Sequence, residues 1–323
     1  MESFSKAWRW LANDPHQLIG VRILQISIGA MLLFRVYTEL PFATFLWGPS
    51  GIGWGSTKLV LGPMLGNALD SVFMTDTRIF YVQFVLYIGA LWLLIGYNTR
   101  LATLLALVSF SLLYNRLPEI TDAGDNLTRL VLMYMLFLLP HRAKFSSGQF
   151  QVWLHNIAVL AITFQLIVVY FTSGLAKANG DWWQQGIAMY YISQVQWFVI
   201  PSTHNLFTNP WIVTIATFSP MFYQLLFPAA IISRLKIPWI LFGILLHVGI
   251  AVLMAMVTFS TVMIGLELFL ISDQEYAQIC NRGRLALGVL ARMPTRTHWT
   301  FHKTKKKIDE AEKEKLLNLI DSP

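Results

Sequence analysis

The sequence has little charge and almost no cysteine for its length. Of its 323 residues, 13% are charged and 55% are hydrophobic, whereas a soluble globular domain carries about 25% charge. The single cysteine, Cys280, excludes an intrachain disulfide, a paired-cysteine redox motif and a cysteine-rich metal site. Scarce charge combined with long apolar runs predicts a polytopic membrane protein.

Several enzyme motifs are also missing. The chain has no GxSxG, no HExxH and no phosphate-binding glycine loop, which disfavours hydrolases and ATPases. No second histidine stands at metal-ligand spacing from His247, so no metal site is predicted. Internal repeats of the kind that build transporters are not detectable, which disfavours a transporter. We expect no cleaved signal peptide, because residues 1–18 are polar and mixed and the first apolar run is long enough to stay as an anchor.

Apolar runs long enough, or nearly long enough, to cross a bilayer occur eight times. About 20 apolar residues cross the hydrocarbon core at a rise of about 1.5 Å per residue. The predicted spans are 19–40, 79–97, 101–116, 125–140, 154–177, 211–233, 237–256 and 257–273, of which the third, fourth and eighth are short. The expected fold is an all-α, polytopic membrane bundle. Pro220 and Pro228 are expected to kink the sixth span.

Loop charges predict that both ends of the chain are cytoplasmic. With the N-terminus inside, the inner segments carry 17 Lys and Arg and the outer segments carry four. This excess predicts an N-in, C-in orientation. The chain then divides into a cytoplasmic segment, 1–18, a membrane domain, 19–273, and a basic cytoplasmic tail, 274–323. The tail indicates contact with anionic lipid and no nucleic acid, and its stretch KTKKKIDEAEKEKLLNLI predicts a charged, solvated helix.

Two outer segments, 41–78 and 178–210, are long and rich in glycine or aromatic residues. Neither is apolar enough to span a membrane or polar enough to be a disordered linker. Both are expected to form short helices and turns on the outer membrane surface.

Polar residues inside membrane spans are costly, so each is a functional candidate. Most of them fall near the outer ends of the predicted spans, with His247 at mid-depth and Glu267 deeper. The outer group comprises Arg35, Asp125, Asn126, Arg129 and Lys177. This distribution predicts a polar cavity that opens to the outside.

Structural interpretations of the same residues stay open. Arg35 and Glu39, four residues apart, could simply anchor a helix end. Asp125 and Arg129 have the same spacing, and the Gly-Asp-Asn stretch is a good helix start. Likewise, the His247 ring could make a helix–helix hydrogen bond. Glu267 could pair with a buried arginine.

Lys177 stands in the stretch YFTSGLAKANGDWWQQG, which follows a long apolar run. It could be an interface anchor that Asp181, four residues on, neutralises. However, three glycines in the stretch permit close backbone turns, and Trp182 and Trp183 could exclude water. In a partly dry pocket, a neutral lysine amine could act as a base or a nucleophile.

The stretch VVYFTSGLAKANGDWWQQGIAMYY resembles the signature of the HTTM superfamily, the membrane domain shared with vitamin K-dependent gamma-carboxylase. The family pattern is an apolar helix ending in Tyr-Phe, a small residue and Gly, then Lys, then Trp and Gly before an aromatic stretch. GDNLTRLVLMYMLFLLP resembles its polar helix start. GILLHVGIAVLMAMVTFSTVMIGLELFL resembles its histidine-bearing span, and LFRVYTELPFATFLWGPSGIGW its first span and outer loop. The resemblance covers roughly residues 15–275.

The resemblance implies a role for Lys177 as a general base, because the matching lysine of the carboxylase deprotonates reduced vitamin K on the lumenal side. A reduced quinone is the candidate cofactor. The further catalytic candidates are His247, Asn126 and Asp125, and the cofactor-binding candidates are Arg35, Arg129, Trp182 and Trp183. The functional histidine in the carboxylase's earlier polar segment has no match here, since Asp125 and Asn126 stand in that segment. A lumenal domain of the carboxylase type is also not expected.

The length, single membrane domain and short basic tail are most similar to the bacterial sporulation-delaying-protein B type of the superfamily. Such proteins act with a small partner to mature a secreted antimicrobial peptide toxin. This implies a multi-pass protein of the bacterial plasma membrane, with membrane lipid, a precursor peptide and a small protein as partners. Two alternatives stay open: a quinone- or vitamin K-linked carboxylase- or epoxidase-like enzyme, and a non-catalytic scaffold, export or immunity factor.

Overall fold

The computed structural model describes residues 8–53, 66–68, 71, 75–140, 148–195 and 200–281, and these residues form helices and turns without a β-strand. The all-α prediction is thus confirmed for the described residues. The chain divides into two compact units, Met1–Asp273 and Gln274–Pro323. The helix expected in the tail lies outside the described residues, and so do residues 54–65, 69–70 and 72–74 of the outer segment 41–78.

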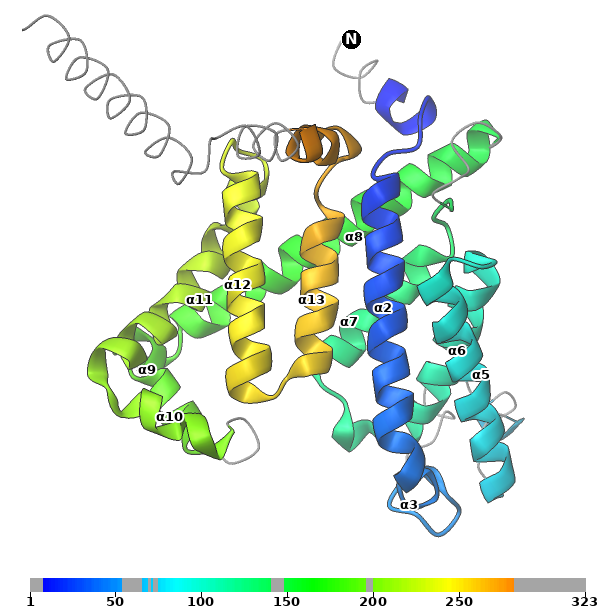
Figure 1. The fold of residues 1–323 in the computed structure, drawn as a ribbon, viewed down its shortest axis with the longest axis horizontal. Coiled ribbons are helices and arrows are strands. Elements are labelled where there is room, and N and C mark those ends of the chain that lie inside the picture. The colour runs from blue at the N-terminus through cyan, green and yellow to red at the C-terminus, as the bar shows by residue number, and fades with distance from the viewer. Residues whose placement is uncertain are drawn as a thin grey trace, which may run out of the picture. The chain divides into compact units, whose positions relative to one another are not determined.

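Long helices of the first unit coincide with the eight predicted spans (Figure 1). They are α2 (Leu18–Glu39), α5 (Asp76–Ile95), α6 (Thr99–Arg116), α7 (Ala123–Met135), α8 (Gln149–Ala178), α11 (Pro210–Ile231), α12 (Lys236–Met254) and α13 (Val257–Phe269). Short helices follow α2, namely η1 (Leu40–Phe42) and α3 (Ala43–Trp47), and η3 (Pro118–Ile120) precedes α7. The positions of the apolar runs therefore predict the positions of the long helices.

Not all of these helices are long and apolar enough to cross a membrane. Five of the described helical segments are: Leu18–Trp47, α5, α8, α11 and α12. The number rises to six if the broken segment that begins with α13 is counted. The 13-residue α7 is only about 20 Å long, shorter than the roughly 30 Å hydrocarbon core. Eight full spans therefore stay a prediction.

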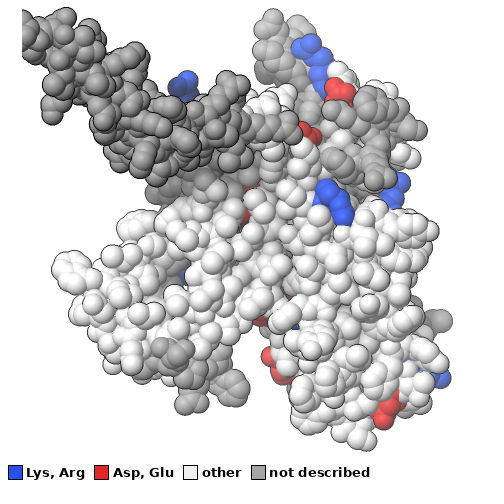
Figure 2. Space-filling model, viewed as in Figure 1, with Lys and Arg blue, Asp and Glu red and all other residues white. Residues whose placement is uncertain are grey.

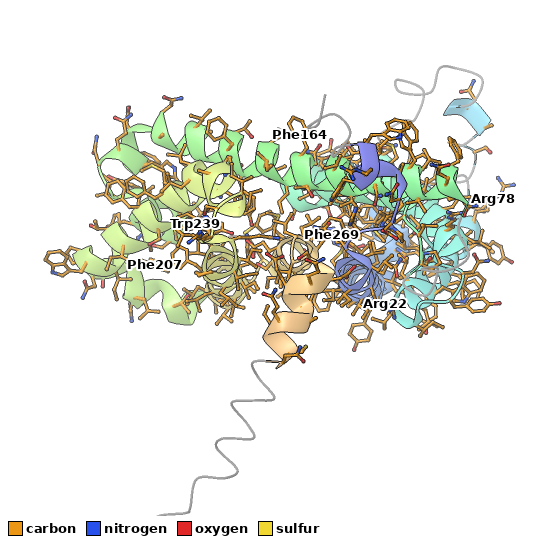
Figure 3. All side chains as sticks on the ribbon, turned by 90° about the horizontal axis from the view of Figure 1, so that it is seen from above. Arg22, Arg78, Phe164, Phe207, Trp239 and Phe269 are labelled. Atoms are coloured by element: carbon orange, nitrogen blue, oxygen red, sulfur yellow. The ribbon has the colours of Figure 1, made fainter. Side chains whose placement is uncertain are left out.

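The helices pack in a row with α8 along one side. The helix α2 packs against α5 and α13, α12 packs against α13 and α11, and α8 packs against α11. Figures 1 and 3 show α8 running obliquely past the other helices. Phe164 points outward from α8, whereas Phe269 lies in the interior. This arrangement brings α8, α11, α12 and α13 together.

Glycines lie where the helices touch. A Cβ on Gly29 of α2 would come within 2.8 Å of the α5 backbone, and one on Gly89 of α5 within 2.9 Å of the α6 backbone. A Cβ on Gly174 of α8 would likewise come within 2.9 Å of the α11 backbone, and one on Gly20 of α2 within 2.6 Å of the α13 backbone. One on Gly265 of α13 would come within 2.6 Å of the Ser27 side chain of α2. Small residues that let backbones approach are typical of helix interfaces in membranes.

Outward-facing side chains of the long helices are largely apolar. Phe164 of α8, Ile215 of α11 and Leu245 of α12 are 67%, 64% and 67% exposed. Figure 2 shows few charged side chains among the described residues of one face. Soluble monomers rarely expose so much contiguous apolar surface, and a lipid environment would cover it.

Between α8 and α11 the chain forms three short helices, α9 (Asp181–Gln184), α10 (Ala188–Ser193) and η4 (Pro201–Thr208). Short helices were expected in this outer segment, and their place at the membrane surface stays a prediction. The next helix, α11, begins after Asn209, whose side-chain oxygen accepts hydrogen bonds from two backbone N–H groups. It continues through both Pro220 and Pro228.

Arg22 of α2 bonds to the end of a neighbouring helix. Its guanidinium donates to the carbonyl oxygens of Leu93 (2.7 Å) and Leu94 (2.5 Å). These carbonyls belong to the last turn of α5, where backbone acceptors lack intrahelical partners. A cation is favoured there by the helix dipole, so Arg22 ties α2 to the end of α5.

Candidate functional site

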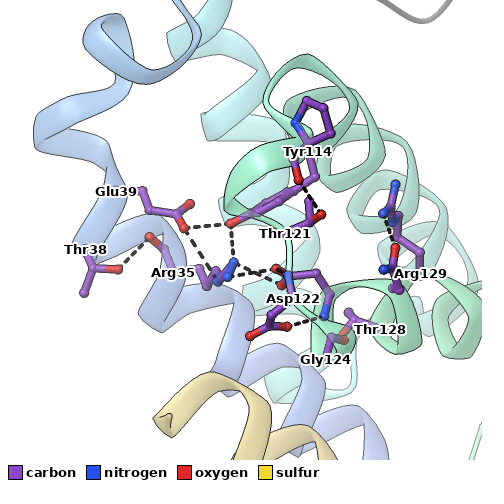
Figure 4. Close-up of polar contacts among 12 residues, drawn as sticks. Arg35, Thr38, Glu39, Tyr114, Thr121, Asp122, Gly124, Thr128 and Arg129 are labelled. Atoms are coloured by element: carbon purple, nitrogen blue, oxygen red, sulfur yellow. Dashed lines mark hydrogen bonds and ion pairs between the residues drawn. The ribbon is translucent and has the colours of Figure 1, made fainter. Parts of the chain in front are cut away.

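Arg35 of α2 is the centre of a buried polar network with α6 and α7 (Figure 4). Its guanidinium forms an ion pair with Asp125 (3.0 Å) and lies 3.6 Å from Glu39, one turn further along α2. It also donates to the Tyr114 hydroxyl (2.6 Å), which in turn donates to Glu39 (2.6 Å). The predicted pair of Arg35 and Glu39 therefore exists, and it belongs to a larger network.

The Asp125 carboxylate also takes part in capping the start of α7. The helix α7 begins after Asp122, which accepts from the Asp125 backbone N–H (2.8 Å), and the Asp125 carboxylate accepts from the Asp122 N–H (3.0 Å). This reciprocal capping box satisfies two backbone donors. The Gly-Asp-Asn stretch was predicted to cap this helix. The N-cap is instead Asp122, three residues before Asp125.

Arg129 does not bond with Asp125, contrary to the pairing suggested by their spacing. It donates to Asn126 (2.5 Å) and to Asn115 of α6 (2.9 Å). The reason is that the buried Asp125 side chain already meets Arg35, whereas Asn126 is exposed on another side of the helix. Asn126 and Arg129 therefore link α6 to α7.

Lys177 lies in the last turn of α8, and its side chain is half-buried. Its Nζ donates to the Gln224 side-chain oxygen of α11 (3.0 Å) and lies 5.2 Å from the centre of the Trp183 ring. Among the ion pairs of the described residues none joins Lys177 to a carboxylate, Asp181 included. The neutralising pair with Asp181 is therefore not formed.

The position of Lys177 follows from the face that α8 turns toward α11. Tyr170, Gly174 and Lys177 are spaced four and three residues apart, so they share one helix face. Tyr170 meets the Tyr223 ring of α11 edge-on, with centroids 5.4 Å apart. The absence of a side chain at Gly174 lets the two helices approach closely, which brings Lys177 to Gln224.

About two turns before Lys177 along α8, a buried cluster joins four helices. Its members are Tyr170 of α8, Tyr223 of α11, His247 of α12 and Glu267 of α13. One oxygen of Glu267 accepts from the Tyr170 hydroxyl (2.5 Å) and from the Tyr223 hydroxyl (2.8 Å). His247 Nε2 lies 2.8 Å from the Tyr170 oxygen and 3.6 Å from the same Glu267 oxygen. We call these four residues the tyrosine–histidine–glutamate cluster.

The cluster answers two questions left open by the sequence. His247 does make a hydrogen bond between helices, and Glu267 pairs with two tyrosines and a histidine rather than with an arginine. Glu267 is 0% and His247 4% exposed. A buried carboxylate needs such partners because desolvation disfavours its charge.

Of the two tryptophans expected to exclude water, one contacts Lys177. Trp183 lies beside the lysine, whereas Trp182 is exposed and stacks on Tyr191 at 4.4 Å. Sequence reasoning did not single out Gln224, Tyr170 or Tyr223. A polar residue within an apolar helix was the available signal for Gln224, and the seven-residue spacing from Lys177 was the signal for Tyr170.

Thus the predicted site residues fall into separate groups of contacts. Arg35 and Asp125 join α2 to α7, and Asn126 and Arg129 join α7 to α6. Lys177 lies with Trp183 and Gln224. His247 belongs to the tyrosine–histidine–glutamate cluster. Within the described part of the chain, no group of three His, Cys, Asp or Glu side chains could hold a metal ion. Chemically, the α8–α11 contact offers an amine that forms no ion pair with a carboxylate of the described residues.

The described part of the chain is thus helical, with five helical segments long and apolar enough to cross a membrane and a lysine-bearing contact at the end of one of them. No protein-family model and no solved structure matches the chain. Over 118 residues it is 29% identical to the uncharacterized protein YitO of Bacillus subtilis (strain 168). This match covers 34% of the chain and 38% of YitO, so the chain spans well under two thirds of that relative.

Proposed function

We propose that the chain is an HTTM-type membrane protein that takes part in maturing a secreted antimicrobial peptide, with Lys177 as its general base. The observation that carries the proposal is the setting of Lys177. The amine is half-buried and meets an amide oxygen and an indole ring instead of a carboxylate. A lysine partly removed from water and lacking a counter-ion is suited to proton transfer.

Gln224 and Trp183 suit both protonation states of such a base. The Gln224 oxygen accepts a hydrogen bond from the neutral amine or from the ammonium, so the nitrogen keeps its place while its lone pair takes up a proton. The Trp183 ring lies within about 6 Å, where an aromatic face attracts the ammonium that forms. In the family that the lysine motif resembles, the matching lysine performs this step.

We also propose eight membrane crossings with both chain ends in the cytoplasm of a bacterial cell. Two observations support this: the eight long helices occupy the eight apolar runs, and the loops place 17 of the basic residues inside against four outside. In this orientation, Lys177 at the end of α8 faces the outer side. A precursor peptide and a small partner protein would then meet it there, and a reduced quinone is its proposed cofactor.

The proposal is tested by complementation of a strain that lacks this gene. Growth inhibition by the culture medium measures the secreted peptide, and immunoblots of membranes measure the protein. General-base catalysis contributes about 10²–10⁴-fold, so Lys177→Arg and Lys177→Ala should lower peptide production by at least about 100-fold at unchanged protein level. Lys236→Arg, at the start of α12, is the control and should restore production.

Two results would contradict the proposal in different ways. If deletion of the gene leaves peptide production unchanged, the protein has no part in maturation. If Lys177→Arg and Lys177→Ala both restore production fully, the protein takes part without a lysine base, as a scaffold would.

A further inference from the structure

We propose that the tyrosine–histidine–glutamate cluster is a binding site for one proton inside the membrane domain, and that Tyr170 passes this proton between His247 and Glu267. The inference stands apart from the role of Lys177, because the side-chain hydrogen bonds of these four residues join them to one another, whereas that of Lys177 goes to Gln224. It rests on their burial, their charges and their hydrogen-bond geometry.

The first step concerns charge. The neighbours that reach Glu267 are the hydroxyls of Tyr170 and Tyr223 and the His247 ring. No Lys or Arg forms an ion pair with Glu267 among the described residues. Where α2 and α7 pack against α13, Ser27 of α2 lies beside Gly265, and Gly124 of α7 lies beside Phe259.

A lone carboxylate at this place would therefore be uncompensated. Uncompensated charge is costly among apolar membrane helices. One added proton makes the cluster neutral as a whole, either as a histidinium beside a carboxylate or as a neutral histidine beside a carboxylic acid. Electroneutrality thus selects a cluster that holds one proton.

The second step concerns hydrogen bonds. A tyrosine hydroxyl has one proton to donate and two lone pairs to accept with. The Tyr170 oxygen lies 2.8 Å from His247 Nε2 and 2.5 Å from a Glu267 oxygen, so it can donate to one and accept from the other. It bridges the imidazole and the carboxyl group of the cluster.

Both arrangements of the proton satisfy the bridge. In the first, His247 Nε2–H donates to Tyr170, and the Tyr170 O–H donates to the Glu267 carboxylate. When the proton moves, the Nε2–H bond breaks and a new O–H bond forms on Tyr170, while the former Tyr170 O–H bond breaks and an O–H bond forms on Glu267. The products are a neutral imidazole, a tyrosine and a carboxylic acid, and no electron is transferred.

Tyr223 provides a matched control for Tyr170. Both are buried tyrosines, and both donate to the same Glu267 oxygen. The hydrogen bonds of the described residues join only Tyr170, and not Tyr223, to His247. Loss of either hydroxyl removes one hydrogen bond to Glu267, but only loss of the Tyr170 hydroxyl removes the bridge.

The test uses the purified full chain in lipid nanodiscs at neutral pH. Infrared spectroscopy detects the carboxylic acid form of Glu267, and nitrogen-15 NMR detects the protonation and exchange of His247. His247→Gln should increase the Glu267 carboxylic acid signal to one proton per chain. Glu267→Gln should abolish that signal and leave His247 neutral.

The bridge is tested by exchange rates. In the wild type and in Tyr223→Phe, His247 should show a single averaged NMR signal, because its proton moves quickly to Glu267 and back. In Tyr170→Phe, it should show separate signals of slow exchange. Equal exchange in Tyr170→Phe and Tyr223→Phe would overturn the bridge, and an ionised Glu267 in His247→Gln would overturn the one-proton site. The latter comparison needs no Glu267 variant, so it holds even if Glu267→Gln fails to fold.

Discussion

Arg35 holds together three helices through one guanidinium group. Its partners Asp125, Tyr114 and Glu39 come from α7, α6 and α2. The ion pair with Asp125 is buried, so each charge depends on the other for compensation. The network is therefore expected to stabilise the fold.

Arg35→Met should therefore destabilise the protein strongly. It leaves the Asp125 carboxylate buried without a counter-ion, which typically costs about 3–5 kcal/mol. Thermal unfolding of the purified protein in detergent measures the loss. The double variant Arg35→Met with Asp125→Asn should recover part of it, because the stranded charge is then absent. Unchanged melting of Arg35→Met would show that the network carries no stability.

Lys177 and Glu267 differ in their surroundings although both are ionisable residues in apolar helices. Lys177 lies at a helix end with one amide and one indole ring, whereas Glu267 is enclosed by hydroxyls and a histidine. Lys177 is partly exposed, whereas Glu267 is fully buried. This contrast is why we assign substrate chemistry to Lys177 and proton storage to Glu267.

At the scale of elements, α12 contains two glycines in opposite settings. A Cβ on Gly243 would overlap the Tyr223 hydroxyl and the Glu267 carboxylate, whereas one on Gly249 would meet no atom within 4 Å. Inside a helix, alanine is otherwise favoured over glycine by about 1 kcal/mol. An alanine at Gly249 therefore tests helix propensity alone, whereas an alanine at Gly243 tests propensity together with close packing.

Gly243→Ala should destabilise the protein by about 1–3 kcal/mol, because the added methyl group displaces the cluster. Gly249→Ala should leave stability unchanged or raise it slightly. Thermal unfolding of both variants in the same detergent makes the comparison. Equal stability of the two variants would mean that α12 does not approach the cluster as closely as the structure shows.

The sequence predicts the helices well because their signal is local. Each apolar run between 19 and 273 contains a long helix. Most breaks fall at turns with polar residues or glycine, but the break between α12 and α13 falls at the apolar pair Ala255 and Met256. The sequence does not predict which helices pack against one another. Arg35 meets Asp125 across 90 residues, and Tyr170 meets Glu267 across 97. Such contacts depend on which helices become neighbours, which one sequence does not state.

For the candidate site, the same limit applies. The motif pointed to Lys177 and Trp183, which the structure brings together. The sequence could not show that the Asp125 carboxylate pairs with Arg35 and caps α7, because its spacing from Arg129 suggested that pair equally well. Tyr170 and Tyr223 escaped notice because a tyrosine in an apolar helix is ordinary until its hydroxyl finds a buried carboxylate.

On the scale of the whole molecule, the central prediction is its orientation in the membrane. The only cysteine of the sequence, Cys280, is exposed. With the C-terminus inside, a membrane-impermeant maleimide should label Cys280 in permeabilised cells and not in intact cells. Labelling of intact cells would place the C-terminus outside.

A second cysteine gives the matched control. Thr208, in the segment between α8 and α11, is exposed. In a Cys280→Ser background, Thr208→Cys should be labelled in intact cells, since this segment is proposed to face outward. Protection of Thr208→Cys in intact cells would move Lys177 to the cytoplasmic side.

The most direct test of the account is to remove the amine of Lys177 and then restore it chemically. Lys177→Cys in the Cys280→Ser background should lose peptide production. Treatment of intact cells with bromoethylamine converts the new cysteine to an amine close in length to lysine, and production should return. Methyl methanethiosulfonate adds a neutral group at the same place and should not restore it. Recovery with the neutral reagent, or full production by the untreated variant, would contradict the claim that Lys177 acts as a base.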